Sequence, residues 1–125
     1  MRKKKFAVFL FSINQEGRQS SLVIIMKGLK YDHDKPKYEL IPAMAINELA
    51  KVLTFGAEKY EPNSWQNVSN GIERYRAALL RHAFAMQSGE KLDIESGLPH
   101  AAHAMCCAAF IIELELELEL ELEAR

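Results

Sequence analysis

Three stretches with the spacing of amphipathic helices constrain the fold of this chain more than any other feature. They run from Ala43 to about Tyr60, from about Ile72 to Gln87, and from Pro99 to about Ile112. Apolar residues recur in them every three to four positions, as a helix with one buried face requires. Breaks rich in proline, glycine, serine and asparagine separate them. No strand-like alternation interrupts this region, so we expect a small all-α bundle with an irregular loop over residues 28–42.

The distribution of charge predicts three regions. Residues 1–25 carry five basic residues and one acidic residue, residues 26–112 carry ten of each, and residues 113–125 carry six glutamates and one arginine. We therefore expect an N-terminal extension, a globular domain over 26–112 and a low-complexity tail. The extension resembles the start of a signal peptide but lacks a small-residue cleavage site, and Met26 is an alternative natural start.

The tail alternates leucine and glutamate with a period of two. Both residues favour helices, but this period would scatter the leucines around a helix axis. We expect the tail to continue the third helix briefly, then to fray, and to have no catalytic role. Its exposed leucines favour self-association.

Two adjacent thiols, Cys106 and Cys107, lie on the third predicted helix. Neighbouring helical residues point about 100° apart, so this pair cannot easily form a disulfide. They are expected to be small buried residues of a cytoplasmic protein.

Histidines and carboxylates gather between residues 81 and 103. His100 and His103 share a helix face, because residues three apart lie about one turn from each other. His82 and Glu95 come from the second helix and the following loop. Imidazoles and carboxylates together can hold a divalent cation. Glu95 suits either a metal ligand or a general base, whereas Glu90 and Asp93 are expected to be solvated charges, with a supporting role as the alternative.

Cationic and aromatic groups accompany this cluster. Arg81, Lys59 and Lys35 can neutralise phosphate groups. Tyr60, Asn63 and Trp65 can hold a nucleobase by stacking and by a hydrogen bond to its edge, although Trp65 equally suits an anchor of the turn. Ser96 is a candidate N-cap of the third helix.

Four blocks in order carry a family resemblance: GLKYDHDKPKYELIP, FGAEKYEPNSW, RYRAALLRH and SGE followed by ESGLPHAAHA. Together they resemble the phage-type dATP/dGTP diphosphohydrolases, which are similar to the all-α MazG-type nucleotide pyrophosphohydrolases. The resemblance covers residues 28 to about 112.

The resemblance implies hydrolysis of purine deoxynucleoside triphosphates to monophosphate and pyrophosphate with Mg²⁺ or Mn²⁺. Family motif positions fall on residues of two kinds. Those for substrate are Lys59, Tyr60, Asn63, Trp65 and Arg81, and those for the metal are His82, Glu95, His100 and His103. Outside these motif positions, Lys35 is expected to reach the phosphates from the loop. Of these, Glu95, His82 and Arg81 are the candidate catalytic residues.

One departure bears on the metal. MazG relatives place carboxylates as E-x-x-E and E-x-x-D on helices, whereas this chain offers His100-x-x-His103. A histidine-rich set would also suit Zn²⁺ or Fe²⁺.

Two other functions stay open: a metal-dependent 5′-nucleotidase acting on monophosphates, and a non-catalytic helical metal-binding or interaction module. The neutral domain shows no basic stripe, so we expect no specific nucleic-acid partner, and no membrane partner either. A homo-oligomer is expected, because three helices close a small core poorly. The setting implied is the cytoplasm of a bacterium or a phage-infected cell.

Overall fold

The computed structural model describes residues 28–125, so the predicted extension over residues 1–25 lies outside them. The chain divides into two units, residues 1–38 and residues 39–125. In the first unit, residues 28–37 form turns and irregular chain, as predicted. The backbone N–H of Lys35 donates to the carbonyl of Asp32 at 3.0 Å.

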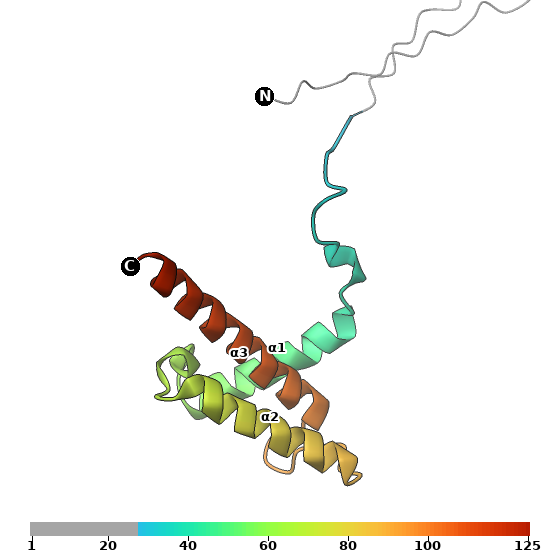
Figure 1. Cartoon of the computed structure of the whole chain (residues 1–125). Coiled ribbons are helices and arrows are strands. Elements are labelled where there is room, and N and C mark those ends of the chain that lie inside the picture. The colour runs from blue at the N-terminus through green and yellow to red at the C-terminus, as the bar shows by residue number, and fades with distance from the viewer. Residues whose placement is uncertain (1–27) are drawn as a thin grey trace, which may run out of the picture. The chain divides into compact units, whose positions relative to one another are not determined.

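Helices account for the regular structure of residues 39–125 (Figure 1). The short 3₁₀ helix η1 (Tyr38–Leu40) leads to α1 (Ala43–Lys59), and a second 3₁₀ helix, η2 (Ser64–Asn67), leads to α2 (Gly71–Gln87) and α3 (His100–Glu123). Across residues 28–125 the extended pairing is limited to an isolated antiparallel bridge between Leu92 and Pro99. The prediction of a small all-α fold is confirmed.

The helix boundaries follow local chemistry. Pro42 precedes the first residue of α1, where a missing N–H costs no helical hydrogen bond. Asn70 adopts a left-handed backbone (φ 54°) immediately before α2. The first residue of α2 is the buried Gly71, where a Cβ would lie 3.1 Å from Leu114 Cδ1 of α3. Glycine therefore permits a close approach of the two helices.

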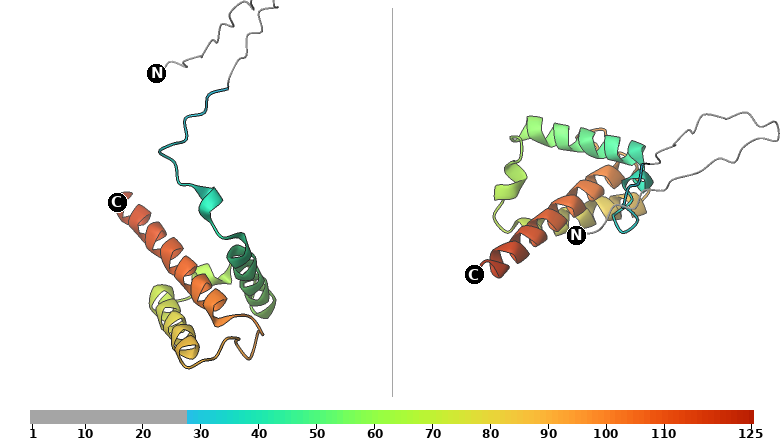
Figure 2. Two further views of the ribbon diagram at one scale, coloured as in Figure 1. Left: turned by 90° about the vertical axis from the view of Figure 1, so that its right-hand side faces the viewer. Right: turned by 90° about the horizontal axis from the view of Figure 1, so that it is seen from above.

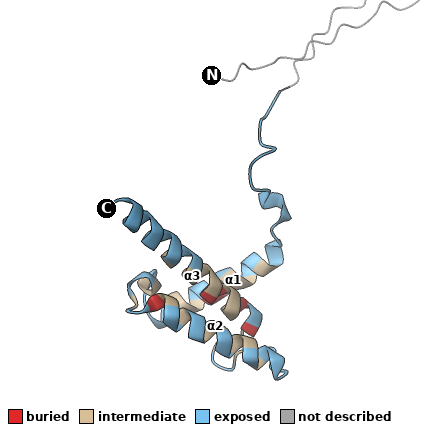
Figure 3. Cartoon of the chain, in the orientation of Figure 1, coloured by how far each residue is buried: buried red, intermediate tan, exposed pale blue. Residues whose placement is uncertain are grey.

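The tail continues the third helix, as predicted, but the predicted fraying was wrong, because α3 runs through the whole leucine-glutamate run to Glu123. Both residue types have high helix propensity, and this intrinsic preference outweighs their strand-like alternation. Leu114 is half-buried, and Glu115 lies 3.9 Å from the guanidinium of Arg76 on α2. The last two turns are exposed, including Leu116, Leu118, Leu120 and Leu122 (Figure 3).

The helix α3 lies at the centre of the unit, packing along α2 and against α1 (Figure 2). Its small residues Ala102, Cys106 and Cys107 are buried, together with Val52 of α1. Leu49, Leu98 and Phe110 pack around Val52, Ala102 and Cys106. The core is therefore thin, and large apolar side chains such as Met44, Phe84 and Ile94 are exposed. These exposed groups are compatible with the predicted homo-oligomer, which stays a prediction.

Within residues 28–125, none of the helices combines the length and the apolar character needed to cross a membrane.

Replacing Phe110 with alanine should destabilise the helical unit. Its ring stacks on Trp65 (centroids 4.3 Å apart) and meets Tyr75 edge-on at 5.0 Å, so it joins α2, α3 and η2. Large-to-small substitutions at such positions cost about 2 to 3 kcal/mol when the site is partly buried. Urea unfolding followed by circular dichroism measures the loss. The matched control is Phe84→Ala, because Phe84 is 67% exposed and its loss should change stability by less than about 0.5 kcal/mol. Equal losses in the two variants would contradict this view of the core.

Candidate active site

A cleft of about 1150 Å³ opens between the end of α1, the face of α2 and the first half of α3. Most of the residues predicted from the sequence line it: Lys59, Tyr60, Asn63, Trp65, Arg81, His82, Glu95 and His103. His100 is buried beside the cleft, only 6% exposed. Lys35 belongs to the separate N-terminal unit, and its contact with substrate stays a prediction. The fold thus brings side chains from three helices and two loops into one cavity.

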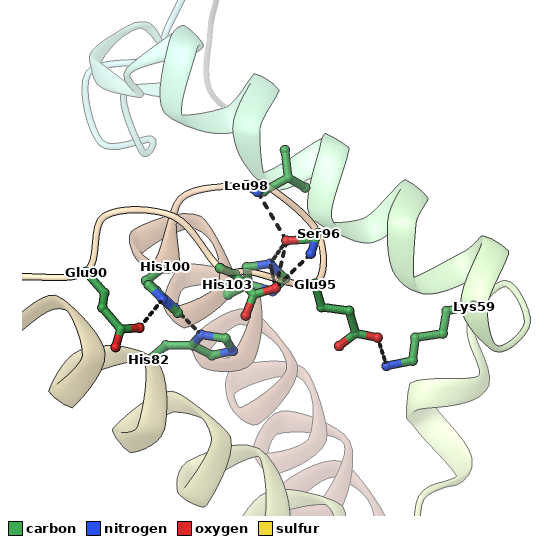
Figure 4. A network of polar contacts seen from close by, with 9 residues as sticks. Lys59, His82, Glu90, Glu95, Ser96, Leu98, His100 and His103 are labelled. Carbon is green, nitrogen blue, oxygen red and sulfur yellow. Dashed lines mark hydrogen bonds and ion pairs between the residues drawn. The ribbon is translucent and has the colours of Figure 1, made fainter.

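Two imidazoles face each other at the inner end of the site. Nδ1 of His82 on α2 lies 2.9 Å from Nδ1 of His100 on α3 (Figure 4). The ring of His103, one turn along α3, stacks on His82 with centroids 4.7 Å apart. In this contact one Nδ1 donates its proton and the other accepts it. When both rings carry their protons on Nε2 instead, the two Nδ1 lone pairs converge on one small volume.

Asp93 joins this pair, although the sequence interpretation favoured a solvated charge. Ligand atoms of His82, Asp93 and His100 all lie within 4.8 Å of one another. Asp93 Oδ2 accepts hydrogen bonds from the backbone N–H of Ser96 at 2.9 Å and from its hydroxyl at 3.0 Å. The carboxylate is therefore ordered and half-buried, with 19% of its side chain exposed.

The loop between α2 and α3 is folded back on itself to hold this carboxylate. The N–H of Asp93 donates to the Leu98 carbonyl at 2.8 Å, and the N–H of Gly97 donates to the Asp93 carbonyl at 2.8 Å. Gly97 has a φ of 70°, a conformation that side chains other than glycine adopt at a cost. This tight turn places Asp93 and Glu95 beside the start of α3.

Ser96 ties the loop to α3 by a different contact from the predicted N-cap. Pro99 is the residue before α3, and no side chain caps the helix. Instead the Ser96 hydroxyl lies 2.6 Å from His103 Nε2 and accepts from the Leu98 N–H at 3.2 Å. Because the hydroxyl proton donates to Asp93, His103 Nε2 must carry the proton of its own contact.

The environment favours the neutral forms of His82 and His103 by lowering their pKa values. Burial lowers the pKa of His82, and the neighbouring charges of His103 and His100 lower it further. Burial also lowers the pKa of His103, against the opposing effect of Asp93. For Asp93, burial acts to raise the pKa, but the hydrogen bonds from Ser96 and the charges of His103 and His82 together outweigh it, and the pKa lies below its usual value. Neutral imidazoles and an ionised carboxylate are the protonation states that bind cations.

Glu95 points into the cleft, away from this cluster (Figure 4). Its Oε1 accepts a hydrogen bond from the ammonium of Lys59 at the end of α1. This contact raises the pKa of Lys59, so the amine is protonated. The pair leaves Glu95 57% exposed and accessible to a bound molecule.

Trp65 serves as the anchor that the sequence analysis gave as its alternative role. Its ring stacks on Phe110, and its carbonyl accepts a hydrogen bond from the Tyr75 hydroxyl at 3.1 Å. The same side chain also lines the cleft.

The site contains two residues that the sequence interpretation underrated, Asp93 and Ser96. A signal for them was present in the order Asp93-x-x-Ser96-Gly97, a spacing at which an aspartate accepts from a backbone N–H three residues on. Such a carboxylate is fixed rather than solvated.

The two cysteines should be inert in the folded protein. Both are buried and free, and burial raises the pKa of Cys106 to about 12. Because the thiolate is the reactive form, modification by a disulfide reagent at pH 8 should be roughly a hundredfold or more slower than after unfolding in urea. Labelling at equal rates in both states would contradict the burial of these thiols.

Comparison with known proteins gives the family. The family model described as "dATP/dGTP diphosphohydrolase, N-terminal" matches residues 26–124. A curated protein of Salmonella phage PMBT28, named dATP/dGTP diphosphohydrolase, is 38% identical over 89 residues, which are 71% of this chain and 30% of that protein. The chain therefore spans about a third of the relative's length. No solved structure matches.

The matched segment includes the whole cleft and all three of its helices. This chain belongs to the family of the N-terminal domain of dATP/dGTP diphosphohydrolases.

Proposed function

We propose that this chain hydrolyses purine deoxynucleoside triphosphates, dATP and dGTP, to the monophosphate and pyrophosphate, using Mg²⁺ or Mn²⁺. The observation that carries the proposal is one cleft lined by Lys59, Arg81, Glu95 and the histidines. Its volume of about 1150 Å³ is large enough for a nucleotide. Family membership and the name of the phage relative support the same reaction. Because the relative is much longer, activity of this segment alone is part of the proposal.

The cationic side chains are assigned to the phosphates. Arg81 lies on α2 at the cleft wall and offers a planar fork that matches phosphate oxygens. Lys59 lies at the end of α1, a different wall of the cleft, and offers a point charge. A triphosphate between them would be held along its length. Tyr60, Asn63 and Trp65 line the same cleft and are assigned to the purine and sugar.

Glu95 is assigned as the general base. Its carboxylate faces the cleft and is held by the Lys59 ammonium. In the proposed step it takes a proton from a water molecule whose oxygen attacks the α-phosphorus. The bond from the α-phosphorus to the bridging oxygen breaks, and pyrophosphate leaves with the electron pair. A bound divalent ion supplies charge neutralisation on the phosphates and makes water more acidic.

A product assay tests this proposal. The chain is incubated with each dNTP, NTP and monophosphate in Mg²⁺ or Mn²⁺, and pyrophosphate and orthophosphate are measured separately. We expect pyrophosphate from dATP and dGTP. Orthophosphate from monophosphates would favour the 5′-nucleotidase instead, and no turnover with any metal would favour the non-catalytic module. We place the reaction in the cytoplasm of a phage-infected cell, where the deoxynucleoside triphosphates dATP and dGTP are available.

A further inference from the structure

We infer that His82, Asp93 and His100 form a binding site for a first-row transition ion of the Mn²⁺ type, with Glu95 outside the ligand set. The use of the ion in catalysis rests on the proposed function, but its binding does not. The inferred set keeps two histidines of the sequence prediction and takes Asp93 in place of Glu95 and His103.

The first support is convergence. The three side chains come from α2, the following loop and α3, and their ligand atoms lie within 4.8 Å of one another. The two Nδ1 atoms are 2.9 Å apart. Ligand atoms about 2.0–2.2 Å from a shared ion lie roughly 3 Å from one another, so little movement separates this arrangement from a coordinated one.

The second support is an unsatisfied buried atom. Nε2 of His100 is buried and has no hydrogen-bond partner among the described residues, and only 7% of its side chain is exposed. Glu90 Oε2 approaches to 3.4 Å without hydrogen-bond geometry. If an ion takes the Nδ1 lone pair, Nε2 carries the proton and faces this carboxylate. A histidine that binds metal usually donates its other N–H to such a group.

The third support is the fixed orientation of Asp93. Two hydrogen bonds from Ser96 hold Oδ2, and a metal-binding carboxylate is usually held in this way. The Ser96 hydroxyl also contacts His103 Nε2. Nε2 of His103 lies 3.8 Å from Asp93 Oδ2, so His103 helps to hold the carboxylate in place through Ser96. Glu95 is engaged on the opposite side with Lys59.

The donor set selects the class of ion. Mg²⁺ requires oxygen ligands in near-octahedral geometry, whereas two imidazole nitrogens and one carboxylate suit Mn²⁺, Fe²⁺ or Zn²⁺. Mn²⁺ therefore fits this site better than Mg²⁺, the other ion expected from the family resemblance.

Mn²⁺ titration of the metal-free chain, followed by the EPR signal of the free aquo ion, tests the site without an activity assay. We expect one bound Mn²⁺ per chain, retained in a hundredfold excess of Mg²⁺. Asp93→Asn and His82→Ala should each weaken binding at least about tenfold. Glu95→Gln and His33→Ala should leave the affinity unchanged, because Glu95 pairs with Lys59 and His33 is 73% exposed in the N-terminal unit.

Pulsed EPR of the unaltered chain adds a readout that does not depend on how the variants fold. Imidazole ligands should give ¹⁴N couplings to the bound Mn²⁺. Absence of these couplings, displacement by equimolar Mg²⁺, or equal weakening in Glu95→Gln and Asp93→Asn would overturn the inference. Binding as predicted in a chain that releases no pyrophosphate would sustain the metal site and refute the proposed function.

Discussion

The Glu95→Gln variant should lose catalysis while its helical unit stays folded. Glutamine keeps the size of the side chain and its contact with Lys59 but cannot take a proton from water. Loss of a general base lowers rates by about a hundredfold to ten-thousandfold, so kcat for pyrophosphate release from dATP should fall within that range. Because the side chain is 57% exposed, the unfolding midpoint in urea should change little.

The matched control for this experiment is Glu58→Gln on α1. Glu58 is exposed and is not among the residues that line the cleft, so the same chemical change there should leave kcat within about twofold. Retention of more than half the activity in Glu95→Gln would remove Glu95 from the role of base.

Removal of divalent ions should lower the rate of pyrophosphate release at least as much as the Glu95→Gln substitution does. The triphosphate carries several negative charges, whereas the side chains assigned to it, Lys59 and Arg81, supply one positive charge each. Without a bound ion, the negative charge of the triphosphate still repels an attacking hydroxide. The attacking water also keeps its high pKa, because no metal ion makes it more acidic. Dialysis against a chelator should therefore reduce pyrophosphate release at least about a thousandfold, and added Mn²⁺ should restore it.

The control for chelation is the same chelator saturated with Mn²⁺, which should leave the rate unchanged. Circular dichroism at each stage separates loss of the ion from loss of the fold. Undiminished turnover in metal-free buffer, verified by elemental analysis, would contradict a metal-dependent reaction.

The helices were predictable from sequence because their boundaries depend on local chemistry. Pro42 precedes α1, and Ser88 and Gly89 follow α2, so propensity and hydrophobic period agree there. The leucine-glutamate run gave conflicting signals, a period of two with residues that favour helices. Helix propensity and continuity with a packed α3 decided the outcome, which periodicity alone could not predict.

The site was less predictable, because it depends on how the loop folds back. The sequence indicated which residue types form the site and the region of the chain that supplies them. Three of the predicted residues, His82, Arg81 and Glu95, do line one cleft. Which carboxylate approaches the histidines is set by the hydrogen bonds around Gly97 and by the contact between Ser96 and His103. These contacts join residues several positions apart, and composition and helical spacing do not encode them. The spacing of Asp93 and Ser96 indicates a fixed carboxylate, but the structure was needed to place that carboxylate beside the histidines.

The most direct test of the central claim is hydrolysis of dATP by this chain in ¹⁸O-labelled water with Mn²⁺, followed by mass spectrometry of both products. Attack at the α-phosphorus predicts one ¹⁸O atom in the phosphoryl group of dAMP and none in pyrophosphate. Label in pyrophosphate, or release of orthophosphate instead, would contradict the account of a diphosphohydrolase site in this cleft.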